Sequence, residues 1–269
     1  MKKSLIAIAA MILISAAVFY LYLYIGVDGK VPNHRPSSNR PAAAVEKAAG
    51  NGVDESKRIR QLAQYKRRHQ SHATSVRLSA PFVSQKPELP NGCEVSALTM
   101  LLRSAGVSAN KMTLAAQVAK VPFSSGGYHG NPNDGFVGNM YHGTRANPGY
   151  GVYHGPIAAL ARKYLGNRVV DLTGSSWQSV ERQLEKGRPV WVITSINFVP
   201  VPDSAWRTWH TRTGDLKISF QEHAVLLTGY DQKNVYFHNP LESRGGSNTG
   251  KALFVAAWKQ FGSQAVSYQ

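Results

Sequence analysis

The chain has 269 residues, of which 43% are hydrophobic, and it carries a formal net charge of +16. This length allows one ordinary domain of roughly 100–200 residues together with additional segments. A single cysteine excludes a disulfide-stapled scaffold, so stability must come from a hydrophobic core, for which the apolar content is sufficient.

The N-terminal segment has the composition of a membrane anchor. Two lysines precede an uncharged, mostly apolar run from Ser4 to Gly26, long enough to cross a hydrocarbon core of about 30 Å as a helix. A cleaved signal peptide is the alternative, but its apolar region is shorter, about 7–15 residues, and ends in small residues. Here the bulky residues from Phe19 to Tyr24 occupy that place. We therefore expect residues 1–26 to be an uncleaved signal anchor, with the N-terminus cytoplasmic and the rest extracytoplasmic.

Residues 27–75 are predicted to be a flexible basic tether. Residues 27–56 are rich in Pro, Ala, Ser, Asn and Gly without an apolar period, whereas residues 57–75 can form a short basic helix. Residues 1–75 contain twelve Lys and Arg against four Asp and Glu, and residues 76–269 contain nineteen against eleven, so each part carries +8. Outside a membrane, the basic tether would meet lipid head groups or anionic wall polymers, or simply be solvated. No nucleic-acid-binding motif accompanies it, so we expect no nucleic-acid partner.

From residue 76 onward the pattern predicts one α+β domain, residues 76–269. A short strand begins it, and the remaining elements follow from apolar periodicity and from turn residues. The predicted helices are 93–105, 112–121, 155–166 and 177–187, the predicted strands are 168–173, 189–196, 222–231 and 234–240, and residues 251–262 are predicted to be a last helix or turn. The strand at 189–196 is β-branched and is expected to be buried on both faces. Because helices come first and antiparallel strands later, the fold class is α+β.

Two long connections interrupt these elements, residues 122–155 and residues 197–220. Connections of this length are uncommon in compact domains and are often functional. The second leaves room for a small hairpin. The aromatic residues nearby could line a peptide-binding cleft or fill the core, and these are Tyr128, Tyr141, Tyr150, Tyr153, Trp206 and Trp209.

The only cysteine, Cys93, stands where the first predicted helix begins, directly after Asn91 and Gly92. Unpaired N–H groups at a helix start favour a thiolate, which is the nucleophilic form. A buried structural cysteine is the competing interpretation, since free cysteines are among the most buried residues. A nucleophilic role would require an imidazole close by.

Of the nine histidines, only His223 and His238 lie on predicted strands. His223 opens its strand at the boundary between a polar loop and an apolar run, where a rigid element can present a side chain to a cleft. If this strand pairs as a hairpin with the next, the residue numbers of opposed partners sum to about 464 or 465. The sum for His223 and Asn239 is 462, so the two residues should lie near the same end. An amide there can accept a hydrogen bond from the imidazole and fix its tautomer.

Five stretches in this order resemble a known family: "QKPELPNGCEVSALTMLL", "NDGFVGNMY", "GYGVYHGPIAALARKY", "HAVLLTGYD" and "VYFHNP". They resemble the papain-like cysteine peptidases of the double-glycine leader peptidase-like group, in its stand-alone membrane-anchored bacterial branch. The resemblance covers about residues 78–260. It implies a papain-like fold, in which an N-terminal central helix carrying the cysteine packs on an antiparallel sheet carrying the histidine and the asparagine.

By position, the resemblance implies that Cys93 is the nucleophile, His223 the general base and Asn239 the residue that orients the imidazole. It also implies that Gln85 stabilises the oxyanion, although a polar loop residue is commonly just solvated. Many relatives carry Asp where this chain has Asn239, and an amide stabilises an imidazolium less well than a carboxylate does. Glu94 and Glu222, beside Cys93 and His223, are expected to be solvated or paired structurally.

The function implied is that of an extracytoplasmic, membrane-anchored cysteine peptidase of Gram-positive type, acting through a thioester on a peptide, a protein or a peptidoglycan peptide. Transporter domains of leader peptidases are absent from the sequence, so cleavage of bacteriocin leaders is not implied. The alternatives are a cell-wall amidase or acyl transferase of the same fold, a silent domain that binds wall polymer or a partner protein, and secretion after signal cleavage. No cofactor or metal is expected, since neither a cysteine pair nor a His-x-x-x-His motif occurs.

Overall fold

The computed structural model describes residues 57–62 and 73–269. The chain divides into two units, Met1–Gln70 and Ser71–Gln269. In the first, residues 57–62 form an exposed helical stretch, which is part of the predicted basic helix. The predicted anchor, residues 1–26, lies outside the described residues. Across the two described stretches, no helix has both the length and the apolar character that crossing a bilayer requires.

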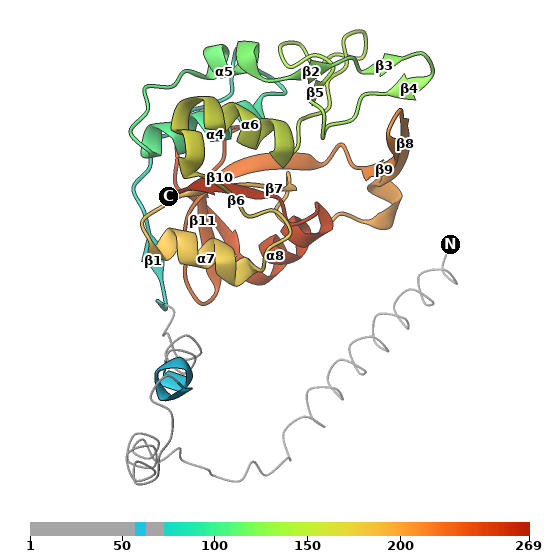
Figure 1. Ribbon diagram of the computed structural model, residues 1–269. Helices are drawn as coiled ribbons and strands as arrows, with labels where there is room; N and C mark the ends of the chain where they lie inside the picture. Colours follow the sequence, from blue (N-terminus) through green and yellow to red (C-terminus); the bar gives the residue numbers. More distant parts are fainter. Residues whose placement is uncertain (1–56, 63–72) are drawn as a thin grey trace, which may run out of the picture. The chain divides into compact units, whose positions relative to one another are not determined.

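The larger unit is built on a seven-stranded antiparallel sheet (Figure 1). Its strands run in the order β12-β11-β10-β7-β13-β6, and β1 pairs with β10. Their bounds are β1 Val76–Arg77, β6 Val169–Asp171, β7 Val190–Ser195, β10 Glu222–Tyr230, β11 Asn234–His238, β12 Ser247–Gly250 and β13 Ala265–Tyr268. In the β10–β11 hairpin, Leu226 opposes His238 and Tyr230 opposes Val235. The register predicted from the residue numbers is therefore confirmed.

Helices cover both faces of this sheet (Figure 1). On one face lie α4 Cys93–Ser104 and α6 His154–Leu165, with α5 Lys111–Gln117 packed on α4. On the other face lie α7 Trp177–Glu185 and α8 Lys251–Gln260, and the two 3₁₀ turns are η1 Gly166–Arg168 and η2 Asp203–Ala205. The predicted class, an α+β fold with the cysteine-bearing helix on an antiparallel sheet, is confirmed.

The central strands are apolar on both sides because each side meets a helical layer. On β7, Trp191 and Ile193 belong to the core shared with α4 and α6, whereas Val190 and Val192 belong to the core shared with α7 and α8. All six residues of β7 are buried, as the sequence predicted. Side chains of a strand alternate between faces, so a continuous apolar run is what a doubly covered strand requires.

Two features fix the position at which α4 starts. Gly92 precedes the helix, and a Cβ on it would lie 2.5 Å from Leu89 Cβ, which leaves no room for a side chain. The indole of Trp191 on β7 donates a hydrogen bond to the Glu94 carbonyl oxygen at 3.0 Å. The first turn of α4 is thus held against the centre of the sheet.

Several predicted elements differ from the structure. The helix predicted at 112–121 ends at Gln117, because Lys120–Val121 forms strand β2 and pairs in parallel with β5, Phe136–Val137. The connection at 122–155 also holds β3 Ser124–Ser125 and β4 Tyr128–His129. The connection at 197–220 contains the small hairpin that the sequence left room for, formed by β8 Arg207–Thr211 and β9 Gly214–Ile218. Strands β12 and β13 were not predicted. Strand β13 pairs with β6 and β7, which are distant in the chain, and a local pattern does not reveal such pairing.

Two buried tryptophans provide a matched test of the two layers. The indole N–H of Trp258 donates to the Gln264 carbonyl at 3.0 Å, the same length as the bond that Trp191 makes on the opposite face. We expect Trp191→Phe and Trp258→Phe each to lower the free energy of unfolding by about 1–3 kcal/mol, because each loses a buried hydrogen bond and leaves a cavity. Unfolding in guanidinium chloride measures the change in the free energy of unfolding. Only Trp191→Phe should also change the alkylation rate of Cys93, and equal effects of both variants on that rate would contradict the proposed anchoring of α4.

Candidate active site

Cys93 is the first residue of α4, and its side chain is buried against β10. Its sulfur lies 3.3 Å from Glu94 Oε2 and also interacts with the backbone of Ala224, the residue that follows His223. The helix start therefore brings the thiol to the beginning of β10, where His223 lies.

His223 and Asn239 are in direct contact, and the predicted register placed them near the same end of the hairpin. The imidazole Nε2 and Asn239 Oδ1 are 2.7 Å apart, and both side chains are buried. The same Oδ1 accepts the backbone N–H of Leu241 at 3.1 Å. Because that contact identifies the atom as an acceptor, Nε2 must carry the proton in the neutral ring. The unprotonated Nδ1 is then left as a hydrogen-bond acceptor.

Burial keeps this imidazole neutral at rest. Desolvation lowers the pKa of His223 to about 4, and the hydrogen bond that the imidazole donates to Asn239 opposes this only in part. Burial also raises the pKa of the Cys93 thiol well above its ordinary value, and the nearby Glu94 and Glu222 raise it further. The resting pair is therefore a thiol beside a neutral base.

Gln85 is 2% exposed, so the interpretation of a solvated loop residue is wrong. Its backbone N–H donates to the Pro240 carbonyl at 2.8 Å, which joins this loop to the residue after Asn239. The side-chain Nε2 donates to the Pro90 carbonyl at 2.6 Å, and Oε1 has no hydrogen-bond partner among the described residues. An amide nitrogen carries two N–H groups, so one donor is left for an oxyanion. The oxyanion role of Gln85 stays a prediction.

Glu94 and Glu222 are buried, so the interpretation of solvated side chains is wrong for both. Glu94 is fully buried and Glu222 is 8% exposed. The backbone of residues 150–153 packs against both, and a Cβ on Gly151 would lie 2.5 Å from Glu94 Oε1 and 2.9 Å from Glu222 Oε2. In the sequence, only their positions next to Cys93 and His223 pointed to these glutamates. Their burial could not be predicted, because it arises when α4, β10 and the 150–153 segment pack together.

Phe198 is a further residue that the sequence did not single out. It has a positive φ of 60°, which is uncommon for a bulky side chain. Its ring centroid lies 6.2 Å from that of His223 and 4.5 Å from that of Phe237. In this conformation Phe198 forms one wall beside the imidazole.

The aromatic residues of the long connections are divided between core and surface. Trp209, Tyr150 and Tyr153 are buried, whereas Tyr128 and Tyr141 are exposed. Trp206 is partly buried and packs against Phe261. The first three therefore belong to the core, and only the exposed pair is available to line a surface.

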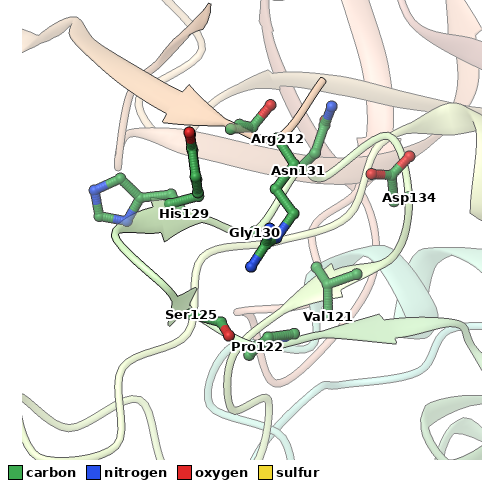
Figure 2. A pocket seen from close by; sticks show the side chains of 10 residues that line it. Val121, Pro122, Ser125, His129, Gly130, Asn131, Asp134 and Arg212 are labelled. Atoms are coloured by element: carbon green, nitrogen blue, oxygen red, sulfur yellow. The ribbon is translucent and has the colours of Figure 1, made fainter. Parts of the chain in front are cut away.

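A small cavity of about 130 Å³ opens beside the short sheet of β3, β4, β8 and β9 (Figure 2). Ser125, His129 and Arg212 are among its lining residues, and the His129 ring stacks on Trp209 with centroids 4.4 Å apart. A larger cavity of about 740 Å³ lies beside α7 and α8 and includes Lys233 and Lys251. None of the predicted catalytic residues lines either cavity.

Known proteins resemble this chain in sequence and in fold. The sequence profile of the "Peptidase_C39 like family" matches residues 77–266. YvpB of Bacillus subtilis (strain 168) is 52% identical over 184 residues, which cover 68% of this chain and 71% of that protein. A crystal structure from Bacillus anthracis, described as that of a C39-like peptidase, is 46% identical with a TM-score of 0.71 and covers 73% of this chain and 98% of its own. The chain belongs to the peptidase C39-like family.

Proposed function

We propose that this protein is a cysteine peptidase that hydrolyses an amide bond through a thioester on Cys93. The observation that carries the proposal is the geometry of His223, whose Nε2 is held by Asn239 Oδ1 at 2.7 Å while Oδ1 also accepts the Leu241 N–H. Nδ1 is the remaining base, and a thiol lies at the start of the facing helix. Nucleophile, base and orienting group in this order form the arrangement used in acyl transfer.

In the proposed reaction, His223 Nδ1 accepts the Cys93 proton as the sulfur attacks the carbonyl carbon of the substrate. The developing oxyanion is stabilised by the backbone N–H of Cys93 and by the free N–H of Gln85. The imidazolium then protonates the departing amine, which leaves a thioester on Cys93. Water, deprotonated by the same imidazole, hydrolyses the thioester and restores the thiol.

Family membership supports a peptide as the substrate class. A peptidoglycan peptide fits the same chemistry, since it also presents an amide, and the predicted anchor and basic tether would hold the enzyme near such a substrate. The competing activities, a wall amidase or an acyl transferase, use the same Cys93 thioester and differ only in the acceptor and the substrate. A silent binding domain would not need His223 to activate the thiol. That no cofactor or metal takes part stays a prediction.

The dependence of Cys93 on His223 tests the peptidase proposal. Cys93 is the only cysteine, so labelling of the full-length chain by a peptidyl chloromethyl ketone reports this thiol alone. We expect His223→Ala to slow labelling at pH 7 by about 100-fold or more, because the proton acceptor is lost. His210→Ala, at an exposed histidine on β8, is the matched control and should label at the wild-type rate. Equal rates in wild type and His223→Ala would support the silent domain instead.

Substitution of Asn239 tests the orientation of the imidazole. We expect Asn239→Asp to raise the pKa of His223 above its value of about 4, because a carboxylate stabilises an imidazolium better than an amide does. Asn239→Ala should lower this pKa and slow labelling by about tenfold or more, since the ring is no longer held in one tautomer. Imidazole NMR titration and labelling kinetics measure both. Asn248→Asp, on the exposed side of β12, should change neither quantity.

Cellular fractionation tests the proposed location. We expect the chain to be in the membrane fraction with its N-terminal residues intact, because the bulky residues after the apolar run disfavour signal cleavage. Mass spectrometry of the N-terminus distinguishes the two forms. A mature N-terminus beyond residue 26 would establish secretion after cleavage.

A further inference from the structure

Two carboxylic acids are buried directly beside the proposed nucleophile. Glu94 follows Cys93 on α4, and Glu222 precedes His223 on β10. Both are more than nine-tenths buried. Neither is used by the mechanism proposed above, and two buried carboxyl groups at one place require a physical explanation.

The two side chains converge with the thiol on one point. The Cys93 sulfur, one carboxyl oxygen of Glu94 and one carboxyl oxygen of Glu222 all lie within 4.8 Å of one another. The thiol makes its hydrogen bond with Glu94 Oε2 at 3.3 Å. The absence of a side chain at Gly151 makes room for both carboxyl groups, since a Cβ there would lie within 3 Å of an oxygen from each.

Hydrogen bonds satisfy this cluster only in part. Glu94 Oε1 accepts the Val152 N–H at 2.8 Å. The buried Oε1 of Glu222 has no hydrogen-bond partner in the described part of the chain, and no described Lys or Arg forms an ion pair with either carboxyl group. Two charges so close and so poorly compensated cannot both be ionised at low cost.

The other titratable groups that face the cluster are uncharged. Tyr150 and Tyr153, from the segment before α6, are hydrogen-bonded through their hydroxyl groups at 2.9 Å, and burial raises the pKa of both phenols. His223, on β10, is neutral because burial lowers its pKa. No cation is therefore available in this part of the structure to neutralise the carboxyl pair, and a proton is the remaining means.

We propose that Glu94 and Glu222 share a proton, and that this buried acid controls the pH range in which Cys93 is nucleophilic. The proposal rests on the proposed function of Cys93 and adds its regulation. Both glutamates are positioning residues, since they act through the thiol. While the pair holds its proton, an acid O–H can donate to the sulfur and support the thiolate. When the pair loses that proton, its negative charge keeps Cys93 protonated.

The directions of the pKa shifts agree with a shared proton. Burial raises the pKa of Glu94 to about 7 and raises that of Glu222 well above its ordinary value, with the charge of Glu94 contributing to the latter. An isolated thiol becomes about tenfold more reactive per pH unit below its pKa, because the thiolate fraction rises tenfold. In this protein the rise should be interrupted near the pH at which the pair ionises, since each proton lost from the pair raises the pKa of the thiol.

The alkylation rate of Cys93 between pH 5 and 9 tests this. In the full-length chain we expect a plateau around pH 7 instead of a continuous tenfold rise per unit. Glu222→Gln removes one charge while keeping the shape, and it should abolish the plateau and increase the rate at pH 8 by about tenfold or more. Glu222→Asp, which keeps the acid, should restore the plateau. Glu242→Gln, the same change at an exposed glutamate, is the matched control and should behave as wild type.

A second measurement separates this proposal from the peptidase function. Carboxyl ¹³C NMR of glutamate-labelled protein follows the protons of the pair whether or not Cys93 is active. We expect Glu94 and Glu222 to titrate together above the exposed glutamates, and Glu222→Gln to lower the midpoint of Glu94. The shared proton would be overturned if Glu94 and Glu222 both titrated in the same pH range as the exposed glutamates. It would also be overturned if wild type and Glu222→Gln gave identical alkylation profiles. Failure of the peptidase function would appear instead as labelling that does not depend on His223, and the wild-type titration decides the question even if a variant does not fold.

Discussion

The site depends on β10 being buried along its whole length between two helical layers. A strand in that position has no freedom to shift register, because a slip of one residue would move its apolar side chains to the wrong layers. The pairing of β10 with β11 brings His223 to Asn239. The first residues of β10 contact Cys93, at the start of α4. The rigidity of one strand thus sets the positions of the Cys93 thiol, the His223 imidazole and the Asn239 amide.

Backbone hydrogen bonds hold the connections near the site in place. Gln85 N–H bonds to the carbonyl of Pro240, and Asn91 N–H bonds to the carbonyl of Met140. The segment around Gly151 then covers the carboxyl pair. Gln85 Oε1 and Glu222 Oε1, which lie near Cys93 and His223, have no hydrogen-bond partner among the described residues, as is common for polar groups at functional sites.

Burial makes the electrostatics of the site unusual for an activated thiol. A helix start and an imidazole both favour a thiolate, yet desolvation and two glutamates oppose it. The balance favours a neutral pair at rest, so proton transfer would accompany attack on the substrate. The glutamates would then determine when this is possible, which links the pH of the surroundings to the nucleophile.

The sequence by itself determined the local features. Apolar periodicity placed the helix that begins at Cys93, the continuous apolar run of 189–196 identified a strand covered on both faces, and residue numbers predicted the register that brings His223 to Asn239. Only the tertiary structure decided the burial of Gln85, Glu94 and Glu222 and the insertion of β13 between β7 and β6. Periodicity reports which face of an element is apolar, whereas desolvation of a polar side chain depends on segments that meet it from far along the chain.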